Sequence, residues 1–171
     1  MSKYESPDYE VIVEDDAYEI RNYSEFYLVE YENINDPDIQ NGFNTLFNYI
    51  AGANRESEKI QMTVPVIEEM KEDKKKIAFV VPHRLWNNIP QPDSSNLSVK
   101  KFDGGKIAAI QYSGLPSESK IDTEIKLLSA WLDSHGYKIK LPFFLAYYNG
   151  PFTLPMFRRN EVLVRVDSVR E

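Results

Sequence analysis

Two histidines are the side chains best suited to acid–base chemistry near neutral pH or to metal ligation. His83 follows Pro82 at the end of a predicted strand, and His135 precedes Gly136 at the end of a predicted helix. They are far apart in sequence and form neither an HxxxH nor an HxH pattern, so a two-histidine metal site is not predicted. The helix dipole favours an imidazolium at a helix C-terminus, which explains His135 as a capping residue.

Other chemistry-bearing patterns are also weak. Acidic pairs such as Asp15-Asp16 and Glu68-Glu69 fall in predicted turns or strand ends, where charge is solvated. The chain has no cysteine, which excludes a thiolate nucleophile, a thiolate metal site and a disulfide. Asp103-Gly104-Gly105 is typical of a turn and not of a phosphate-binding loop. We therefore predict a protein that is not an enzyme, with no metal-ligating residues.

The strongest candidate binding surface is an apolar segment near the end of the chain, "YNGPFTLPMFRRNEV". Loops are normally polar, so apolar side chains in a proline-stiffened loop predict a surface that something covers. The arginine pair that follows could bind carboxylates of a ligand or pair with acidic neighbours such as Glu161. The side chains in question are Phe152, Leu154, Met156, Phe157, Arg158 and Arg159.

Antiparallel strands and one helix are predicted to position the first half of the chain. Alternation and aromatic or β-branched residues predict strands at 9–13, 18–20 and 26–31. A helix is predicted from Asp36, as its cap, with Pro37 in the first turn and Gly52 as its stop. Its apolar stripe is Phe43, Leu46, Phe47 and Ile50, for which core packing is the favoured interpretation.

The helix is followed by two further predicted strands. Residues 59–66 alternate, with Ile60, Met62, Val64 and Val66 on one face, and Pro65 indicates an edge or a bulge. The charged stretch 68–76 is predicted to turn the chain into a strand at 77–81.

After a proline-rich linker at 82–95 the same order of elements repeats. A hairpin is predicted from 97–102 and 107–112, then a helix from Ser117 to Gly136, then strands at 143–148 and 161–166. Residues 20–23 correspond to residues 99–102, so the repeat halves are about 9–82 and 97–167 of one domain, 1–171. This predicts an α+β fold in which helices pack on a curved, barrel-like antiparallel sheet, built from a pseudo-twofold duplicated unit with a groove where helix meets loop.

Composition limits the partners. A net charge of −7 disfavours nucleic acid, whose phosphates require clustered lysine and arginine. No stretch resembles a signal sequence or a membrane span, so we expect a cytoplasmic protein with no membrane partner.

Two motifs resemble those of the SOUL/heme-binding protein family. They are "GFNTLFNYIAGANRESEKIQMTVPV" at residues 42–66 and "YYNGPFTLPMFRRNEV" before the last predicted strand. Tyr18-Glu-Ile-Arg and the Pro90-x-Pro92 segment also fit, so the likeness covers nearly the whole chain. The family fold is a distorted antiparallel β-barrel with two flanking helices, which agrees with the repeat.

The resemblance implies a non-enzymatic function. Characterised members bind heme or other tetrapyrroles in a shallow apolar groove between the first helix and the loop before the last strand, in some cases without a histidine ligand. Carried over by position, the cofactor-binding residues are Phe43, Leu46, Phe47, Ile50, Met62, Phe152, Leu154, Met156, Phe157 and, near the heme propionates, Arg158.

Two alternatives to a tetrapyrrole carrier stay open. The chain could be an effector-binding module for another flat hydrophobic molecule, in which case a buried carboxylate would meet a cationic ligand. It could also be a protein-interaction domain in which another chain covers the loop, and concentration-dependent association would support that. A fold alone does not choose among these functions.

Overall fold

Two units, each built from antiparallel strands, one α-helix and one short 3-10 helix, make up the described part of the chain. The computed structural model describes residues 4–32, 39–70 and 75–168. Unit 1 comprises Met1–Pro7 and Glu25–Asp103, and unit 2 comprises Asp8–Ser24 and Gly104–Glu171. The strands and helices place the chain in the predicted α+β class.

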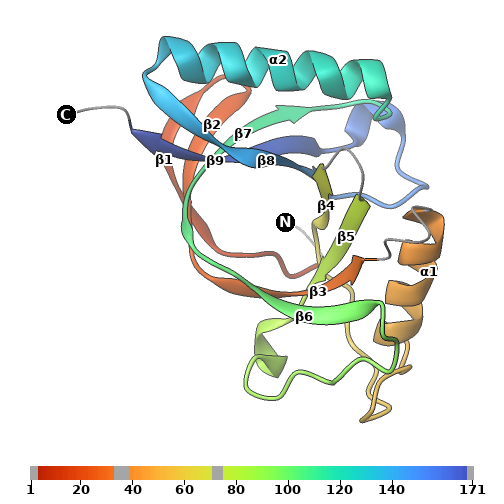
Figure 1. Cartoon of the computed structure of the whole chain (residues 1–171). Helices are drawn as coiled ribbons and strands as arrows, with labels where there is room; N and C mark the ends of the chain where they lie inside the picture. The colour runs from red at the N-terminus through yellow and green to blue at the C-terminus, as the bar shows by residue number, and fades with distance from the viewer. Residues whose placement is uncertain (1–3, 33–38, 71–74, 169–171) are drawn as a thin grey trace. The chain divides into compact units, whose positions relative to one another are not determined.

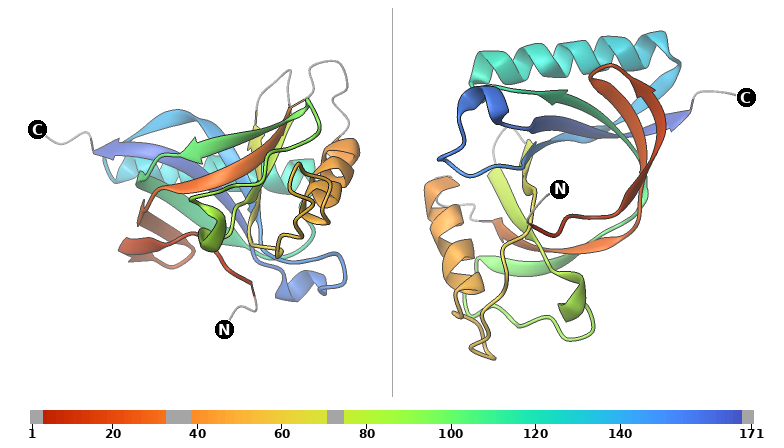
Figure 2. Two further views of the ribbon diagram at one scale, coloured as in Figure 1. Left: turned by 90° about the horizontal axis from the view of Figure 1, so that it is seen from below. Right: turned by 180° about the vertical axis from the view of Figure 1, so that it is seen from behind.

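Unit 1 is a four-stranded sheet in the order β4-β5-β3-β6 with α1 packed on β5 and β3 (Figure 2). Its core lies between α1 and the sheet, where Leu46 and Tyr49 pack with Val29, Ile77 and Phe79. Its elements are β3 (Phe26–Glu32), α1 (Ile39–Ile50), β4 (Val66–Met70), β5 (Lys75–Val80), η1 (His83–Leu85) and β6 (Leu97–Phe102).

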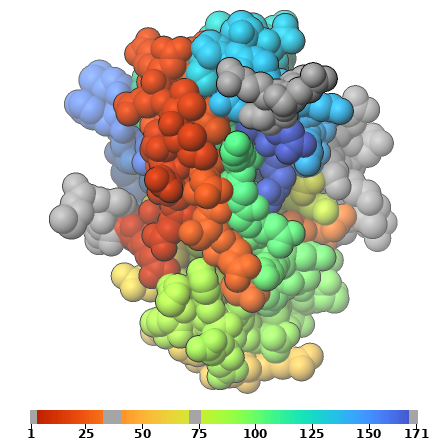
Figure 3. All heavy atoms as spheres, turned by 90° about the vertical axis from the view of Figure 1, so that its left-hand side faces the viewer, coloured from red at the N-terminus to blue at the C-terminus, as the bar shows by residue number. Residues whose placement is uncertain are grey.

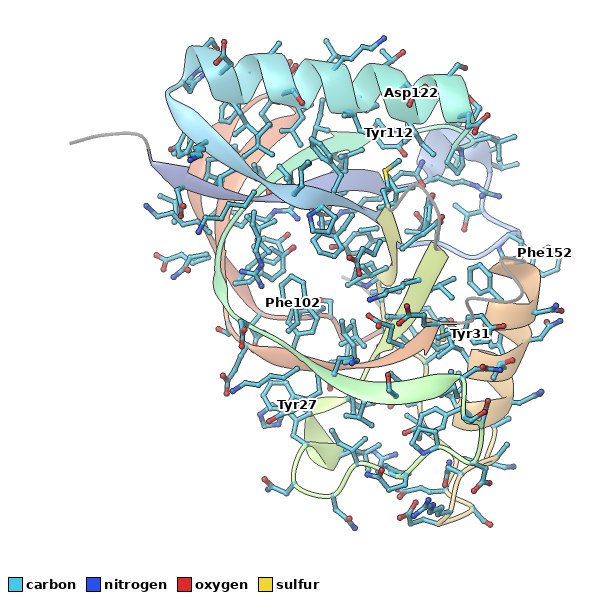
Figure 4. The ribbon with its side chains drawn as sticks, in the orientation of Figure 1. Tyr27, Tyr31, Phe102, Tyr112, Asp122 and Phe152 are labelled. Atoms are coloured by element: carbon cyan, nitrogen blue, oxygen red, sulfur yellow. The ribbon has the colours of Figure 1, made fainter. Side chains whose placement is uncertain are left out.

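One glycine sets how closely α1 approaches its sheet. A Cβ at Gly42 would lie 2.8 Å from Cδ1 of Tyr31 and 2.9 Å from Cγ2 of Ile77, closer than real Cβ contacts. Tyr31 projects from β3 toward α1 (Figure 4). The glycine therefore lets the helix backbone pack directly on the Tyr31 ring.

Unit 2 is a five-stranded sheet in the order β1-β2-β7-β9-β8, and α2 lies across it (Figure 1). Leu128 and Leu132 of α2 are fully buried, and the ring of Trp131 stacks on that of Tyr18 with centroids 5.1 Å apart. Its elements are β1 (Tyr9–Asp15), β2 (Tyr18–Tyr23), β7 (Gly105–Tyr112), α2 (Glu118–Ser134), β8 (Tyr137–Tyr147), η2 (Pro155–Phe157) and β9 (Asn160–Ser168).

The residues predicted to begin and end α2 do so in the structure. The Ser117 side chain accepts a hydrogen bond from the backbone N–H of Lys120, and Gly136 follows the helix with a φ of 75°. The corresponding signals for α1, Asp36 and Pro37, lie outside the described residues.

The predicted repeat is present, but its first strands are exchanged between the units. The chain runs β2-β3-α1-β4-β5 and then β6-β7-α2-β8-β9. β6 pairs with β3 in unit 1, whereas β2 pairs with β7 in unit 2. The predicted hairpin of 97–102 with 107–112 is therefore wrong, because Asp103-Gly104 connects two units and does not fold β7 back on β6.

A second correction concerns residues 59–66, which do not form the predicted strand. Pro65 has no N–H, and two other donors of this segment bond outside the sheet: Ile60 N to the Ile50 carbonyl and Val64 N to the Glu5 carbonyl. Pairing begins only at Val66, so the charged stretch predicted as a turn contributes residues 68–70 to β4 and residues 75 and 76 to β5.

Two further observations concern the surface and the membrane. β1 is largely exposed, with Val11 and Ile12 at 41% and 49%, and its atoms (red) lie on the face shown in Figure 3. None of the helices in the described residues combines the length and the apolar character needed to cross a bilayer.

Candidate functional site

The loop between β8 and β9 exposes four large apolar side chains. Phe152 is 100% exposed, Leu154 58%, Met156 71% and Phe157 69%. Figure 4 labels Phe152 on this loop. An exposed apolar group of this size in one short segment is typical of a binding surface.

Hydrogen bonds within unit 2 link the two ends of this loop. The Arg158 guanidinium donates from Nε to the Thr153 carbonyl and from Nη2 to the Pro151 carbonyl, both at 3.0 Å. At the loop's C-terminal end, the Arg159 N–H donates to Oδ1 of Asn149 at 2.6 Å. The apolar side chains are thus presented by an ordered backbone.

The same end of the loop leads into a buried ionic cluster, of which the sequence suggested only the pairing of the arginine pair with Glu161. Glu161 is 0% exposed and Arg21 1%, and Nη1 of Arg21 donates to Oε1 of Glu161 at 2.8 Å. Nε and Nη2 of Arg159 both donate to Oε2 of Glu161, at 3.2 and 3.0 Å. Nε of Arg21 also donates to Glu19 at 2.6 Å. One buried carboxylate is therefore shared by two guanidinium groups.

Three tyrosines line this ionic cluster. Nη1 of Arg21 donates to the Tyr23 hydroxyl at 2.9 Å, and Nη2 of Arg159 donates to the Tyr9 hydroxyl at 3.2 Å. The Arg159 guanidinium carbon lies 3.9 Å from the centre of the Tyr148 ring, a cation–π contact.

Burial and these charges shift several pKa values. Burial alone would raise the pKa of Glu161, but hydrogen bonds and charge from Arg21 and Arg159 outweigh it and hold that pKa below its usual range. Burial raises the pKa of Tyr23 to about 12 and also raises the pKa of Tyr148. The carboxylate is thus ionised at neutral pH and the phenols are neutral.

In unit 1 the predicted helix residues divide between core and surface. Leu46 is 0% exposed and belongs to the core, and Phe43, Ile50 and Met62 are half-buried against that core. Phe47 is 46% exposed, and its ring meets Phe79 edge-on with centroids 5.3 Å apart. Only part of the predicted stripe is available to a ligand in this structure.

Neither histidine lies among the predicted ligand-binding residues. His83 is exposed, and its ring packs against Trp86 with centroids 4.3 Å apart. Nδ1 of His135 lies 2.7 Å from the Trp131 carbonyl, at the end of α2, which matches the predicted capping role. Within the described ranges, no three His, Asp or Glu side chains gather as a metal site would require.

The structure therefore brings the predicted site residues together as two separate groups. Phe152, Leu154, Met156, Phe157 and Arg158 share the loop of unit 2. The helix residues and Met62 belong to unit 1, so the groove predicted between helix and loop stays a prediction.

A family model for the SOUL heme-binding protein matches residues 4–165, nearly the whole chain. The chain belongs to the SOUL heme-binding protein family. Heme-binding protein 2 of Mus musculus is 28% identical over 158 residues, covering 85% of this chain and 76% of that protein. Heme-binding protein 2 of Homo sapiens is 27% identical over 157 residues, with the same coverage.

Solved structures with similar folds are more distant in sequence. The C-terminal domain of EcmrR matches with a TM-score of 0.62 and 15% identity, covering 94% of this chain and 99% of that one. A hydrolase from Listeria innocua matches with a TM-score of 0.63 and 13% identity, covering 91% and 94%. At these identities the likeness concerns the fold alone.

Several residues of the two motifs shared with SOUL proteins build the scaffold. Asn54 is 3% exposed, and its side chain bonds the carbonyls of Tyr49 and Glu58 and the N–H of Glu58. The Thr63 hydroxyl donates to the Val80 carbonyl at 2.6 Å, and Nδ2 of Asn160 donates to the Gly114 carbonyl at 2.9 Å. These polar side chains hold the loops that flank the apolar surfaces.

The part of the ionic cluster that the sequence analysis missed is its β2 side, because only the pairing of the arginine pair with Glu161 was considered. Glu19, Arg21 and Tyr23 occupy alternate positions of β2 and so share one face of the sheet. Charged residues at period two in a strand that also carries Ile20 were the available signal, but no single sequence shows that Glu161, 140 residues away, is their partner.

Proposed function

We propose that this SOUL-family chain binds heme or another tetrapyrrole and does so without catalysing a reaction. The observation that carries the proposal is the ordered loop with four exposed apolar side chains, Phe152, Leu154, Met156 and Phe157. The exposed ring of Phe47 on α1 is the second proposed contact. Flat apolar macrocycles bury large area on such surfaces.

The side chains present suit apolar binding better than axial ligation. His135 lies at the end of α2 and His83 in η1 against Trp86, so neither belongs to the apolar surface proposed to contact the ligand. The thioether of Met156, whose side chain is 71% exposed, and that of half-buried Met62 are weak potential iron ligands. The proposed fit therefore depends on burial of the macrocycle, and iron is not required for it.

The relatives support the same ligand class. Two mammalian proteins named heme-binding protein 2 match over most of this chain, and the family is named for heme binding. Because the net charge is −7, the proposed partner is a small molecule and not nucleic acid. The proposed compartment is the cytoplasm.

The ionic cluster bears on the alternative of a cationic effector. Glu161 is a buried carboxylate, the feature expected for that function, but its oxygens are occupied by Arg21 and Arg159. A cationic ligand would have to displace a guanidinium from a buried pair, which costs several kcal/mol, on the order of 3–5. The tetrapyrrole proposal is therefore preferred.

The test is a titration of the purified protein with hemin and, in parallel, with iron-free protoporphyrin IX. Soret absorbance and quenching of Trp86 and Trp131 follow binding. Saturable one-to-one binding of both is expected. Binding of hemin alone would instead indicate ligation of iron by the protein, and no saturable binding of either compound would contradict the proposal.

A further inference from the structure

Arg158 was predicted to meet ligand carboxylates, but its guanidinium is used inside the loop. Nε and Nη2, one edge of the planar fork, each donate to a backbone carbonyl, those of Thr153 and Pro151, at 3.0 Å. That edge is one that commonly binds a carboxylate in bidentate geometry. Two hydrogen bonds to carbonyls five and seven residues away close the loop into a ring.

The apolar side chains of this loop depend on its backbone for their position. Phe152 and Met156 are 100% and 71% exposed, so core packing does not position them. Other bonds to the loop backbone are Phe157 N to the Leu154 carbonyl at 2.9 Å and Arg158 N to the Pro155 carbonyl at 3.1 Å, both local, and Gly114 N to the Pro155 carbonyl at 2.8 Å, which ties the loop to the segment after β7. The guanidinium is the one described contact that joins the two arms of the loop at both Pro151 and Thr153.

We infer that Arg158 is a positioning residue: it clamps the 150–157 loop so that its apolar side chains form a preorganised surface for the face of a flat ligand. This inference rests on the proposed function. It also defines the ligand class further, because a surface that recognises the macrocycle accepts tetrapyrroles with or without free carboxylates.

The neighbouring arginine supports this division of roles. Nε and Nη2 of Arg159 both donate to buried Glu161, and its guanidinium stacks on Tyr148. Its charge is therefore compensated within the protein. Neither arginine therefore offers its side-on fork to a propionate.

Arg158→Lys separates the clamp from the charge. Lysine keeps the positive charge but has a single ammonium on a flexible stem, which cannot reproduce a planar two-carbonyl fork. Affinity would be measured for deuteroporphyrin IX and for its neutral diamide, in which both propionates are converted to amides. Arg84→Lys, at a 54% exposed arginine of unit 1 paired with Glu58, is the matched control.

If Arg158 clamps the loop, Arg158→Lys should lower the affinity for both porphyrins by the same factor, roughly tenfold, because two charge-assisted hydrogen bonds that order the loop are lost. The clamp also predicts faster hydrogen exchange at the amides of Phe157 and Arg158, with no ligand present. Arg84→Lys changes neither quantity.

The outcomes separate the inference from the proposed function. Two results for Arg158→Lys would overturn the clamp while leaving tetrapyrrole binding in place. One is a lower affinity for deuteroporphyrin IX alone and not for its diamide, and the other is no change in affinity or in amide hydrogen exchange. If the wild type binds neither porphyrin, the proposed function fails, and the exchange rates alone then decide whether Arg158 clamps the loop.

Discussion

At the scale of single residues, the exposed loop gives the most direct prediction. Phe157→Asp places a charge on a side chain that is 69% exposed, so unfolding free energy should change by only about 0.5 kcal/mol. Porphyrin binding should be lost, because the carboxylate would have to be desolvated against the macrocycle. Thermal melts and the Soret titration measure the two quantities.

Leu127→Asp on α2 is the matched control for Phe157→Asp, since Leu127 is 44% exposed and lies outside the loop. It should bind porphyrin like the wild type. A large fall in the melting temperature of Phe157→Asp would show that Phe157 is a core residue and would remove it from the proposed surface.

In the ionic cluster we expect a substitution to lower the stability of the fold, whereas Phe157→Asp is expected to affect binding. Glu161→Gln removes the fully buried carboxylate partner of Arg21, which is 1% exposed, and leaves Glu19 as the only ion-pair partner of that guanidinium among the described contacts. The expected loss is about 3–5 kcal/mol in denaturant unfolding. Glu10→Gln, an exposed glutamate of β1, should leave stability within about 0.5 kcal/mol of the wild type.

The lowered pKa of Glu161 also predicts an acid dependence. In the unfolded chain this carboxyl titrates with the ordinary glutamate pKa of 4.5, and in the folded protein its pKa lies lower, so the unfolded state binds more protons as pH falls. The added stability is present above about pH 4.5 and is lost as pH falls through the folded pKa. Unfolding of Glu161→Gln should lack this part of the acid dependence; an identical pH slope would contradict the assignment.

At the scale of elements, α1 illustrates what its sequence could and could not predict. The apolar stripe identified the helix and its buried face, and Leu46 lies in the core as its spacing implies. The role of Gly42 was not visible, because a glycine inside a helix is interpreted only as a cost in propensity. The contact with Tyr31 that requires it joins different elements.

Gly42→Ala therefore tests whether the steric cost of an added Cβ exceeds the gain from the higher helix propensity of alanine. Alanine gains up to about 1 kcal/mol over glycine in a helix, but its Cβ would lie 2.8 Å from the Tyr31 ring. Overpacking typically costs about 1–3 kcal/mol, so a net loss of stability is expected. Asn48→Ala, at an exposed position of the same helix, should be neutral or stabilising, and a stabilised Gly42→Ala would show that α1 can shift from its sheet.

The two wrong predictions of secondary structure have the same cause: the segments form hydrogen bonds with residues that are distant in sequence. Residues 59–66 alternate like a strand, yet Val64 bonds Glu5 and the segment joins no ladder until Val66. Residues 97–112 have the sequence pattern of a hairpin, yet β6 pairs with β3, and β7 pairs with β2 and β9. Local periodicity identifies an extended segment but not the strand with which it pairs.

At the scale of the whole molecule, the exchanged strands explain why the repeat was visible and its pairing was not. The order strand-strand-helix-strand-strand is a local property and could be predicted. Each unit takes a strand from the other half of the repeat: β6 pairs with β3 in unit 1, and β2 pairs with β7 in unit 2. The compact units therefore do not coincide with the sequence halves 9–82 and 97–167, and neither half carries a complete sheet.

The last prediction distinguishes a ligand from a partner chain as the cover of the apolar loop. If a second copy covers it, the wild type associates as concentration rises and Phe157→Asp does not. If a tetrapyrrole covers it, both proteins sediment alike at all concentrations. Porphyrin at about 100 times its dissociation constant then raises the unfolding free energy of the wild type alone, by about 2.7 kcal/mol.

Sedimentation velocity and porphyrin-dependent thermal melts on the same two proteins make this comparison. Association of the wild type that Phe157→Asp abolishes would favour the interaction-domain alternative. Because Phe152 and Phe157 are exposed and the loop is ordered without a partner, we expect the ligand result: a surface already folded by Arg158 needs no second chain to shape it.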